Sequence, residues 1–247
     1  MLRNAFAYIT RKWPKSLLLF SIILLMGTLS LIGLSMKGAT QKASSESLGS
    51  ITNSFSMQIN RRTNPGTPRG AGNLRGEDIE KISQVEGITS SIKRINAIAD
   101  ILDHEIIETE ETLQNQSPER AKHFKNTLMV TGVNDSSKED KFVSGAYKLV
   151  QGDHLTDKDK NQILMHEDLA KKNGLKVGDK VRLKSNLYDA DNEKGANETV
   201  EVTIKGLFSG KNQAPLTYAQ ELYEDTLISD LDTAAKLYGN TVQTATY

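Results

Sequence analysis

The segment from Gly206 to Asn212, GLFSGKN, comes closest to a nucleotide-binding motif. A phosphate-binding loop has the pattern G-x-x-x-x-G-K-[ST], in which backbone amides surround the phosphates and the hydroxyl group reaches Mg²⁺. Here only three residues separate the glycines, and Asn212 stands where the motif needs serine or threonine. The segment also follows an alternating apolar run, so we expect it at the exit of a strand and not before a helix. We therefore expect no nucleotide binding by this chain.

Two histidines that precede glutamate begin the pattern of a zinc protease. That chemistry needs a second imidazole one helical turn after the first, on the same face of the helix. His166 is followed four residues later by Ala170, and His104 by Glu108. Neither pair places two imidazoles together, so the sequence predicts no zinc site.

The segment 157–168 resembles a calcium-binding loop at some of its ligand positions. Asp157, Asp159, Asn161 and Asp168 occupy positions one, three, five and twelve. Position six is Gln162 where the loop needs glycine, and the twelfth ligand lacks the long arm of glutamate. A solvated loop is favoured over a calcium site.

Composition and charge exclude several other classes. The chain has 247 residues, enough for one large or two small domains. It contains no cysteine, which excludes disulfides, thiol nucleophiles and thiolate-bound metals. The 31 basic and 31 acidic residues balance, so a strongly basic nucleic-acid binder is excluded. No G-x-S-x-G nucleophile motif occurs either. We expect no catalytic, cofactor-binding or metal-binding residues, and therefore no enzyme.

Residues 16–36, SLLLFSIILLMGTLSLIGLSM, form a run of 21 residues without a charge. At about 1.5 Å per helical residue the run would span about 31 Å, the thickness of a bilayer hydrocarbon core. The alternative is a cleaved secretory signal, whose apolar region has about 7–15 residues and precedes a small-residue cleavage site. This run is longer, and no good cleavage site follows it. We therefore predict one transmembrane helix over 16–36.

The flanks of this run predict its orientation. The leader 1–15 contains Arg3, Arg11, Lys12 and Lys15 and no acidic residue, which leaves 27 basic against 31 acidic residues for the rest of the chain. Positive charge beside a first membrane segment favours a cytoplasmic N-terminus. Residues after Met36 are then extracytoplasmic, and the zero net charge averages two compartments.

The leader itself has the pattern of an amphipathic helix. Leu2, Phe6, Ile9 and Trp13 are spaced four, three and four residues apart and share one helical face. A basic helix with such a face lies in the membrane surface. The alternative is a frayed leader before a simple anchor.

The remainder, 51–247, reads as one α+β extracytoplasmic domain behind a polar helical stalk at 37–50. A strand at 51–60, a helix at 77–84 and a strand at 88–102 suggest a βαβ unit. The charged residues 103–125 are expected to form a surface insertion that is partly helical or disordered. Further strands are expected at 127–133, 148–155, 162–165 and 180–184, and an alternating segment at 198–210. Further helices are expected at 166–172, ending at Asn173-Gly174, and at 229–238, with Ser229 at its start.

One stretch of the domain carries a specific pattern, YKLVQGDHLTDKDKNQILMHEDLAKKNGLKVGDKVRL followed by ETVEVTIKGLF. It resembles the extracytoplasmic domain of MacB/FtsX-like ABC transporter permeases. The matching residues are Leu149, Gly152, Ala170, Gly174, Leu175, Gly178, Asp179, Ile204, Gly206 and Phe208. Similar matches occur in the basic leader and after the first helix of the domain, at Arg3, Asn4, Arg11, Lys12, Val85, Gly87 and Ile88. Within the family, the Vex-type permeases are the most similar.

The resemblance implies a fold and a function. The domain would contain a porter-like βαβ part and an inserted, mostly-β subdomain. The protein would be the permease subunit of an ABC exporter, with a cytoplasmic ATPase subunit, a second permease subunit and the lipid bilayer as its partners. Family members have three further membrane helices and a coupling segment, and none of these precedes Tyr247. The resemblance therefore implies that the chain is the N-terminal portion of a longer permease.

A second hypothesis belongs to another class. A protein with one membrane span could be a single-pass anchored binding or adaptor protein without ATPase coupling. Three further hydrophobic spans in the coding frame beyond Tyr247 would support the permease, whereas a stop codon there would support the adaptor.

Overall fold

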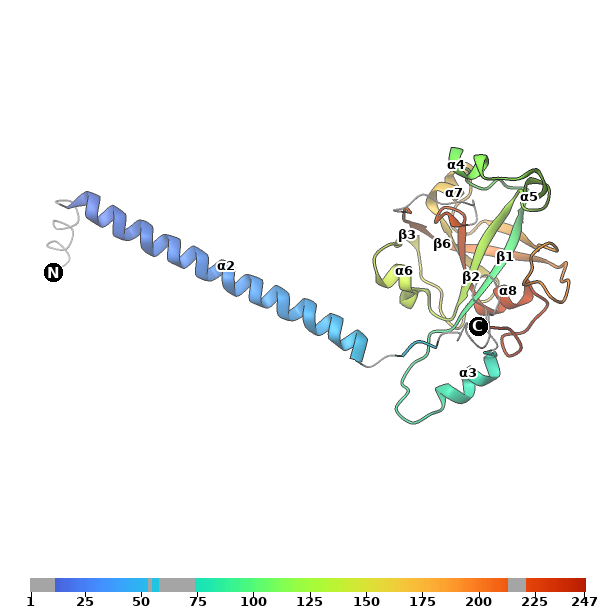
Figure 1. Cartoon of the computed structure of the whole chain (residues 1–247), viewed down its shortest axis with the longest axis horizontal. Helices are drawn as coiled ribbons and strands as arrows, with labels where there is room; N and C mark the ends of the chain where they lie inside the picture. Colours follow the sequence, from blue (N-terminus) through green and yellow to red (C-terminus); the bar gives the residue numbers. More distant parts are fainter. Residues whose placement is uncertain (1–11, 53–54, 58–73, 213–220) are drawn as a thin grey trace. The chain divides into compact units, whose positions relative to one another are not determined.

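The computed structural model describes residues 12–52, 55–57, 74–212 and 221–247. The chain divides into two compact units, residues 1–58 and 59–247, and each is described by itself. Figure 1 shows the long helix of the first unit and the strand-rich second unit.

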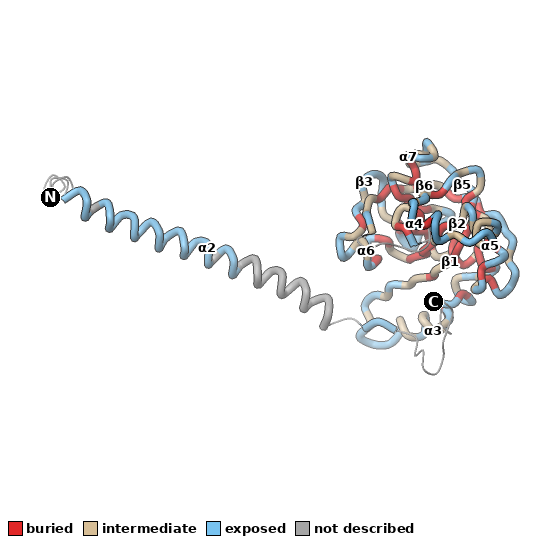
Figure 2. Tube along the Cα trace, turned by 45° about the horizontal axis from the view of Figure 1, so that its top comes forward, coloured by how far each residue is buried: buried red, intermediate tan, exposed pale blue. Residues whose placement is uncertain are grey.

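The first unit is one long helix, α2 (Trp13–Thr52), of 40 residues. Its part from Trp13 to Lys37 is long and apolar enough to cross a membrane. The residues of this part whose burial is described are exposed (Figure 2). In the described residues it is the only helix of this kind. The helix continues without interruption through residues 37–52, which is about 24 Å at the rise of an α-helix. The expected surface helix over 1–15 falls largely outside the described residues.

The second unit combines a mixed sheet with short helices. Its strands are β1 (Arg94–Leu102), β2 (Thr127–Val133), β3 (Lys148–Gly152), β4 (Gln162–His166), β5 (Lys180–Ser185), β6 (Thr199–Ser209) and β7 (Thr226–Asp230). Its helices are α3 (Gly76–Ser83), α4 (Glu110–Gln114), α5 (Pro118–His123), the 3₁₀ helix η1 (Ser136–Lys138), α6 (Asp140–Val143), α7 (Glu167–Lys172) and α8 (Leu231–Lys236).

The strand pairings close into a ring. The sheet order is β3-β6-β4-β7-β2-β1-β5, and β5 also pairs with β6. The ring can form because β6 is long enough to have different partners along its length. Its first half, Thr199–Thr203, pairs with β5, whereas its second half pairs with β3 on one edge and with β4 on the other. Only β3 therefore remains outside the ring.

Two apolar clusters cover opposite faces of the central strands. In β4, Ile163 and Met165 belong to the larger cluster and Leu164 to the smaller one. In β6, Leu207 and Phe208 divide in the same way. Successive side chains of a strand point to opposite faces, so a strand buried on both sides needs an uninterrupted apolar run. Figure 2 shows the resulting buried centre of the second unit.

The prediction for 51–60 is wrong where the structure describes those residues. Ile51 and Thr52 end α2, and residues 55–57 form no strand. The rest of that segment lies outside the described residues. The described residues before α3 therefore supply no strand for the expected βαβ unit, whereas α3 itself lies one residue from its predicted bounds.

The strand predicted at 88–102 begins only at Arg94. The side chain of Asn134 explains the late start. Its Oδ1 accepts a hydrogen bond from the Lys93 amide at 2.7 Å, and its Nδ2 donates to the Ser91 carbonyl at 2.9 Å. These backbone groups are satisfied by a side chain, so they do not enter the ladder with β2.

Two other boundaries also differ from prediction. The strand predicted at 148–155 ends at Gly152, whose φ of +76° turns the chain out of the extended conformation. The cap of α8 is Asp230, not Ser229: its carboxylate accepts from the Thr233 amide at 3.0 Å and from the Thr233 hydroxyl at 2.7 Å. The strand predicted at 127–133 is confirmed by β2, and the helical content predicted in 103–125 by α4 and α5. The segment 103–125 is not wholly a surface insertion, because Ile106 is buried in the larger cluster.

Candidate functional site

In the described residues, the segments that came closest to catalytic motifs do not have the local structure that those motifs need. Gly206–Ser209 are the end of β6, and Gly210–Asn212 continue without a helix. A phosphate-binding loop needs a helix whose amides point at the phosphates, and the described residues form none there. The described residues also contain no group of three or more His, Cys, Asp or Glu that could hold a metal ion.

In the candidate calcium loop 157–168, one of the expected ligands binds a lysine side chain. Asp159 Oδ2 accepts hydrogen bonds from Lys205 Nζ at 2.7 Å and from the Thr156 amide and hydroxyl at 2.7 and 2.9 Å. Partial burial tends to raise the pKa of Asp159, but these hydrogen bonds outweigh it and hold the pKa below its ordinary value. The carboxylate closes a turn and binds Lys205 of β6. The prediction of a solvated loop over 157–168 holds only for its first residues, because Gln162–His166 form β4 and Glu167 begins α7.

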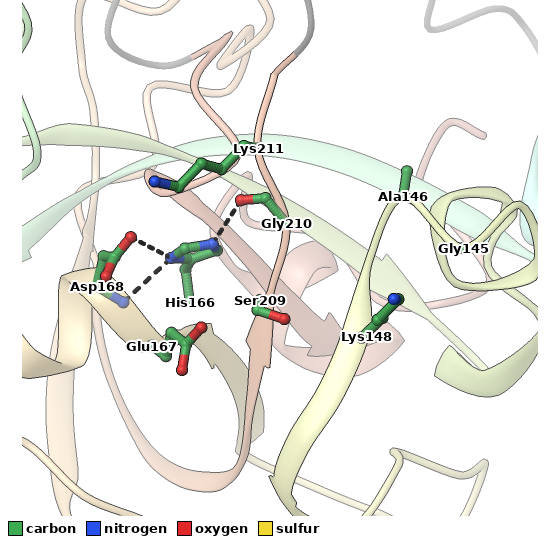
Figure 3. Close-up of a pocket in the computed structure, with 9 residues that line it drawn as sticks. All are labelled: Gly145, Ala146, Lys148, His166, Glu167, Asp168, Ser209, Gly210 and Lys211. Atoms are coloured by element: carbon green, nitrogen blue, oxygen red, sulfur yellow. Dashed lines mark hydrogen bonds and ion pairs between the residues drawn. The ribbon is translucent and has the colours of Figure 1, made fainter.

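His166 lines a pocket of about 280 Å³ between the ends of β3, β4 and β6 (Figure 3). The imidazole is buried, and Nδ1 accepts from the Asp168 amide at 3.1 Å. Nε2 therefore carries the proton and donates to the Gly210 carbonyl at 2.8 Å. Both ring nitrogens are used, so the ring joins β4 to the end of β6 and has no free nitrogen for acid–base or metal chemistry.

The charges around that pocket do not select one kind of ligand. Lys148 and Lys211 face it together with Glu167 and Asp168. The two basic and two acidic side chains favour neither an anionic nor a cationic ligand. The lining of the pocket therefore indicates no particular ligand or reaction.

The residues that carry the family resemblance, in contrast, lie at the junctions between β3, α7, β5 and β6. Gly152 of β3 pairs directly with Gly206 of β6. A Cβ atom on Gly152 would lie 2.1 Å from the carbonyl oxygen of Lys205, and one on Gly206 would lie 2.8 Å from that of Gln151. The two glycines allow the backbones of β3 and β6 to approach more closely than any side chain permits.

The end of α7 uses three further residues of the pattern. The Gly174 amide donates to Lys171 and the Leu175 amide donates to the Ala170 carbonyl at 2.8 Å, with Gly174 at φ +66°. This is the Schellman arrangement, in which a left-handed glycine ends the helix and Leu175 returns to the core. The predicted left-handed cap at Asn173-Gly174 is confirmed.

The turn into β5 connects the pattern to β6. Asp179 Oδ2 accepts from the Lys176 amide at 3.0 Å, as the sequence predicts for an aspartate that closes a turn. The Gly178 amide donates to the Ile204 carbonyl at 2.8 Å, and the Ile204 amide donates to the Asp179 carbonyl at 2.9 Å. Since Gly178 has φ +95°, the turn needs glycine there.

Phe208, another residue of the pattern, lies on the other face of the sheet, in the smaller apolar cluster. Its ring is fully buried and lies 4.5 Å from that of Tyr147 and 5.3 Å from that of His166, measured between centroids. Leu149, which pairs with Phe208 across β3 and β6, packs against the same cluster. The pattern therefore encodes how β3, α7, β5 and β6 are joined, and its residues have structural roles.

The sequence interpretation missed one titratable group, Asp225. It is completely buried immediately before β7, and burial, as the largest cause, raises its pKa to about 8. In the sequence Asp225 resembles any charged residue that precedes an apolar strand, so no local signal distinguishes it.

Comparison with known proteins covers nearly the whole chain. The model of the family described as MacB-like periplasmic core domain matches residues 16–246. No curated protein matches the chain. The family match extends from the apolar part of α2 through every described strand of the second unit.

Proposed function

Because the chain belongs to the family of the MacB-like periplasmic core domain, a family of ABC transporter permeases, we propose that it transmits ATP-driven motion to an extracytoplasmic domain. ATP would be hydrolysed in a separate cytoplasmic subunit, and the chain itself would catalyse no reaction. The membrane helices of the exporter would move when the ATPase closes, and the outer domain would follow as a body.

The observation that carries this proposal is the continuity of α2. The helix passes from its apolar part, Trp13–Lys37, into residues 38–52 without a break. A continuous helix would carry a displacement stiffly as far as Thr52, whereas a flexible segment directly after the membrane helix would absorb it. The division into a membrane helix at 16–36 and a stalk at 37–50 is part of the proposal.

The second unit has the properties of a domain that moves rigidly. Its ring of paired strands and the two buried clusters leave few independent parts. The assignment of a porter-like βαβ part and an inserted, mostly-β subdomain within 51–247 also belongs to the proposal, as does the similarity to Vex-type permeases.

Charge supports the proposed orientation. Arg3, Arg11, Lys12 and Lys15 precede the uncharged run 16–36, so we place the N-terminus in the cytoplasm and residues after Met36 outside the membrane. The proposed partners are a cytoplasmic ABC ATPase, a second permease subunit and the lipid bilayer. No nucleic acid is expected.

Affinity purification of the full-length protein from detergent tests the first part of the proposal. A P-loop ATPase should be recovered with it. Recovery of the protein without an ATPase would contradict the permease and favour the single-pass adaptor.

A break in α2 tests the transmission of motion. In the complex, ATP should change hydrogen exchange in the domain 74–247, and residues 37–50 should themselves be protected. Ala43→Pro should abolish the response of the domain to ATP, because proline interrupts a helix, while the ATPase is still recovered. Ala43→Ser is the matched control and should retain the response. Rapid exchange at 37–50 in the wild-type complex would contradict a stiff stalk.

A further inference from the structure

Residues 105–107, which follow β1, are bound to the rest of the domain by side chains. The side-chain amide of Asn173 accepts from the Glu105 amide and donates to the Glu105 carbonyl, both at 2.9 Å. Lys172 Nζ donates to the Ile106 carbonyl at 2.7 Å. The Ile107 amide donates to Asp225 Oδ1 at 2.7 Å. No strand ladder includes this segment, so these contacts and the buried side chain of Ile106 hold it in place.

Asp225 is the unusual member of this set. Its side chain is completely buried, and Oδ2 has no hydrogen-bond partner among the described residues. Its backbone is held firmly, because its carbonyl accepts from the Met129 amide at 3.0 Å and its amide donates to Leu222 at 3.2 Å. The carboxyl group therefore cannot reach water by a shift of its own strand. The one hydrogen bond that its carboxylate accepts among the described residues comes from Ile107, so a movement of residues 105–107 would release it.

The charges facing Asp225 are mainly of its own sign. Glu224, the preceding residue, and Glu108, just beyond the segment, both disfavour the ionised carboxylate. Lys172 acts in the opposite direction, but its ammonium group is shared with the Ile106 carbonyl and with Glu105 at 3.5 Å. An ionised Asp225 would thus be a buried charge with one amide donor and an incomplete counter-charge.

We propose that residues 105–107 form a latch that closes over Asp225 while its carboxyl group is protonated and opens when the proton is lost. The protonated carboxyl still accepts the Ile107 hydrogen bond through Oδ1, so closing satisfies that amide and buries Ile106. The ionised carboxylate needs water around Oδ2, and opening provides it. The latch does not depend on the proposed transport function, since it uses only groups of the second unit.

The direction of the pH effect follows from the two pKa values. Burial raises the pKa of Asp225 to about 8 in the closed state, whereas an exposed aspartate has a pKa of about 4. The closed state therefore binds the proton more tightly, and it loses stability relative to the open state as pH rises between these values. One proton is involved, so the opening equilibrium should increase about ten-fold per pH unit in that window and level off above about 8.

Native-state hydrogen exchange on the full-length protein in detergent measures this opening. Exchange rates are expressed as protection relative to an unstructured peptide at the same pH. Protection of the Glu105 and Ile107 amides should fall about ten-fold per unit from pH 5 to 8 and then become constant. Amides of the β5–β6 ladder provide the internal reference and should show no such slope.

Two variants identify the titrating group. Asp225→Asn keeps an acceptor for the Ile107 amide but cannot ionise, so its protection should be independent of pH. Glu224→Gln is the matched control: it should keep the slope, with a plateau at lower pH, because one like charge is removed. A slope that survives in Asp225→Asn but disappears in Glu224→Gln would overturn the assignment to Asp225. If Asp225→Asn fails to fold, the wild-type profile decides, and constant protection from pH 5 to 8 would refute the latch.

Discussion

Replacement of Gly152 by alanine tests whether the close approach of β3 and β6 governs this part of the fold. The added methyl group would lie 2.1 Å from the Lys205 carbonyl oxygen and 2.7 Å from the Cα atom of Gly206. Both neighbours are backbone atoms of a paired strand, so they cannot rotate away as a side chain would. The two strands would have to separate, and overpacking of this kind costs about 1–3 kcal/mol.

The backbone conformation adds a second cost. Gly152 has φ +76°, and a residue with a Cβ atom loses about 1–2 kcal/mol in a left-handed conformation. The free energy of unfolding should therefore fall by about 2–5 kcal/mol in Gly152→Ala. Gly178→Ala is the matched control, because Gly178 has φ +95° but no atom within 4 Å of an added Cβ. It should lose only the conformational part, about 1–2 kcal/mol.

Thermal unfolding of the full-length protein in detergent, followed by near-ultraviolet circular dichroism of the tyrosines, measures the difference. For a domain of this size, 1 kcal/mol corresponds to about 2–4 °C in Tm. Gly152→Ala should thus unfold roughly 2–12 °C below Gly178→Ala. Equal transition temperatures would show that conformational strain alone matters and that the close approach of the strands has no energetic weight.

Three further substitutions should each lower the free energy of unfolding, measured by denaturant titration of the full-length protein. Phe208→Ala removes a fully buried ring and should cost about 3–5 kcal/mol; a loss below 1 kcal/mol would mean that the smaller cluster repacks. Tyr238→Phe leaves the Ile98 amide, which donates to the hydroxyl at 3.0 Å, without its buried acceptor and should cost about 1–3 kcal/mol. Asp179→Ala removes the acceptor of the Lys176 amide and should cost about 0.5–2 kcal/mol, whereas Asp179→Asn, which keeps an acceptor, should cost less.

Local patterns predicted the elements whose signal lies within their own residues. The apolar run of α2, the strand β2 and the Asn173-Gly174 end of α7 were all readable, because composition, residue alternation and a left-handed cap act over a few residues. The roles of Gly178 and Asp179 in a turn were readable for the same reason.

Boundaries that depend on a distant residue were not predictable in this way. The late start of β1 is due to Asn134, about forty residues further along the chain. Apolar spacing continued through Ile88 and Ile92, so the pattern alone favoured a longer strand. The cap of α8 differs for a more local reason: Asp230 and Ser229 are both good caps, and the aspartate binds both the amide and the hydroxyl of Thr233.

The chemistry of the candidate sites shows the same division. His166 was singled out because glutamate follows it, but only the folded chain shows that both of its ring nitrogens are bonded. Asp225 gave no signal, because its pKa depends on burial in the folded domain and on a hydrogen bond from Ile107, more than a hundred residues earlier.

The sequence by itself determined an uncharged helix long enough to span a membrane, an α+β domain after it, the absence of thiol chemistry and a pattern of glycines and aspartate that led to the family. These features depend on composition and on contacts between near neighbours in the chain. Only the tertiary structure decided that the strands close into a ring, that Gly152 and Gly206 face each other, and that the buried carboxylate of Asp225 binds the Ile107 amide. Each of these requires residues far apart in sequence to meet, and burial and close approach arise only when they do.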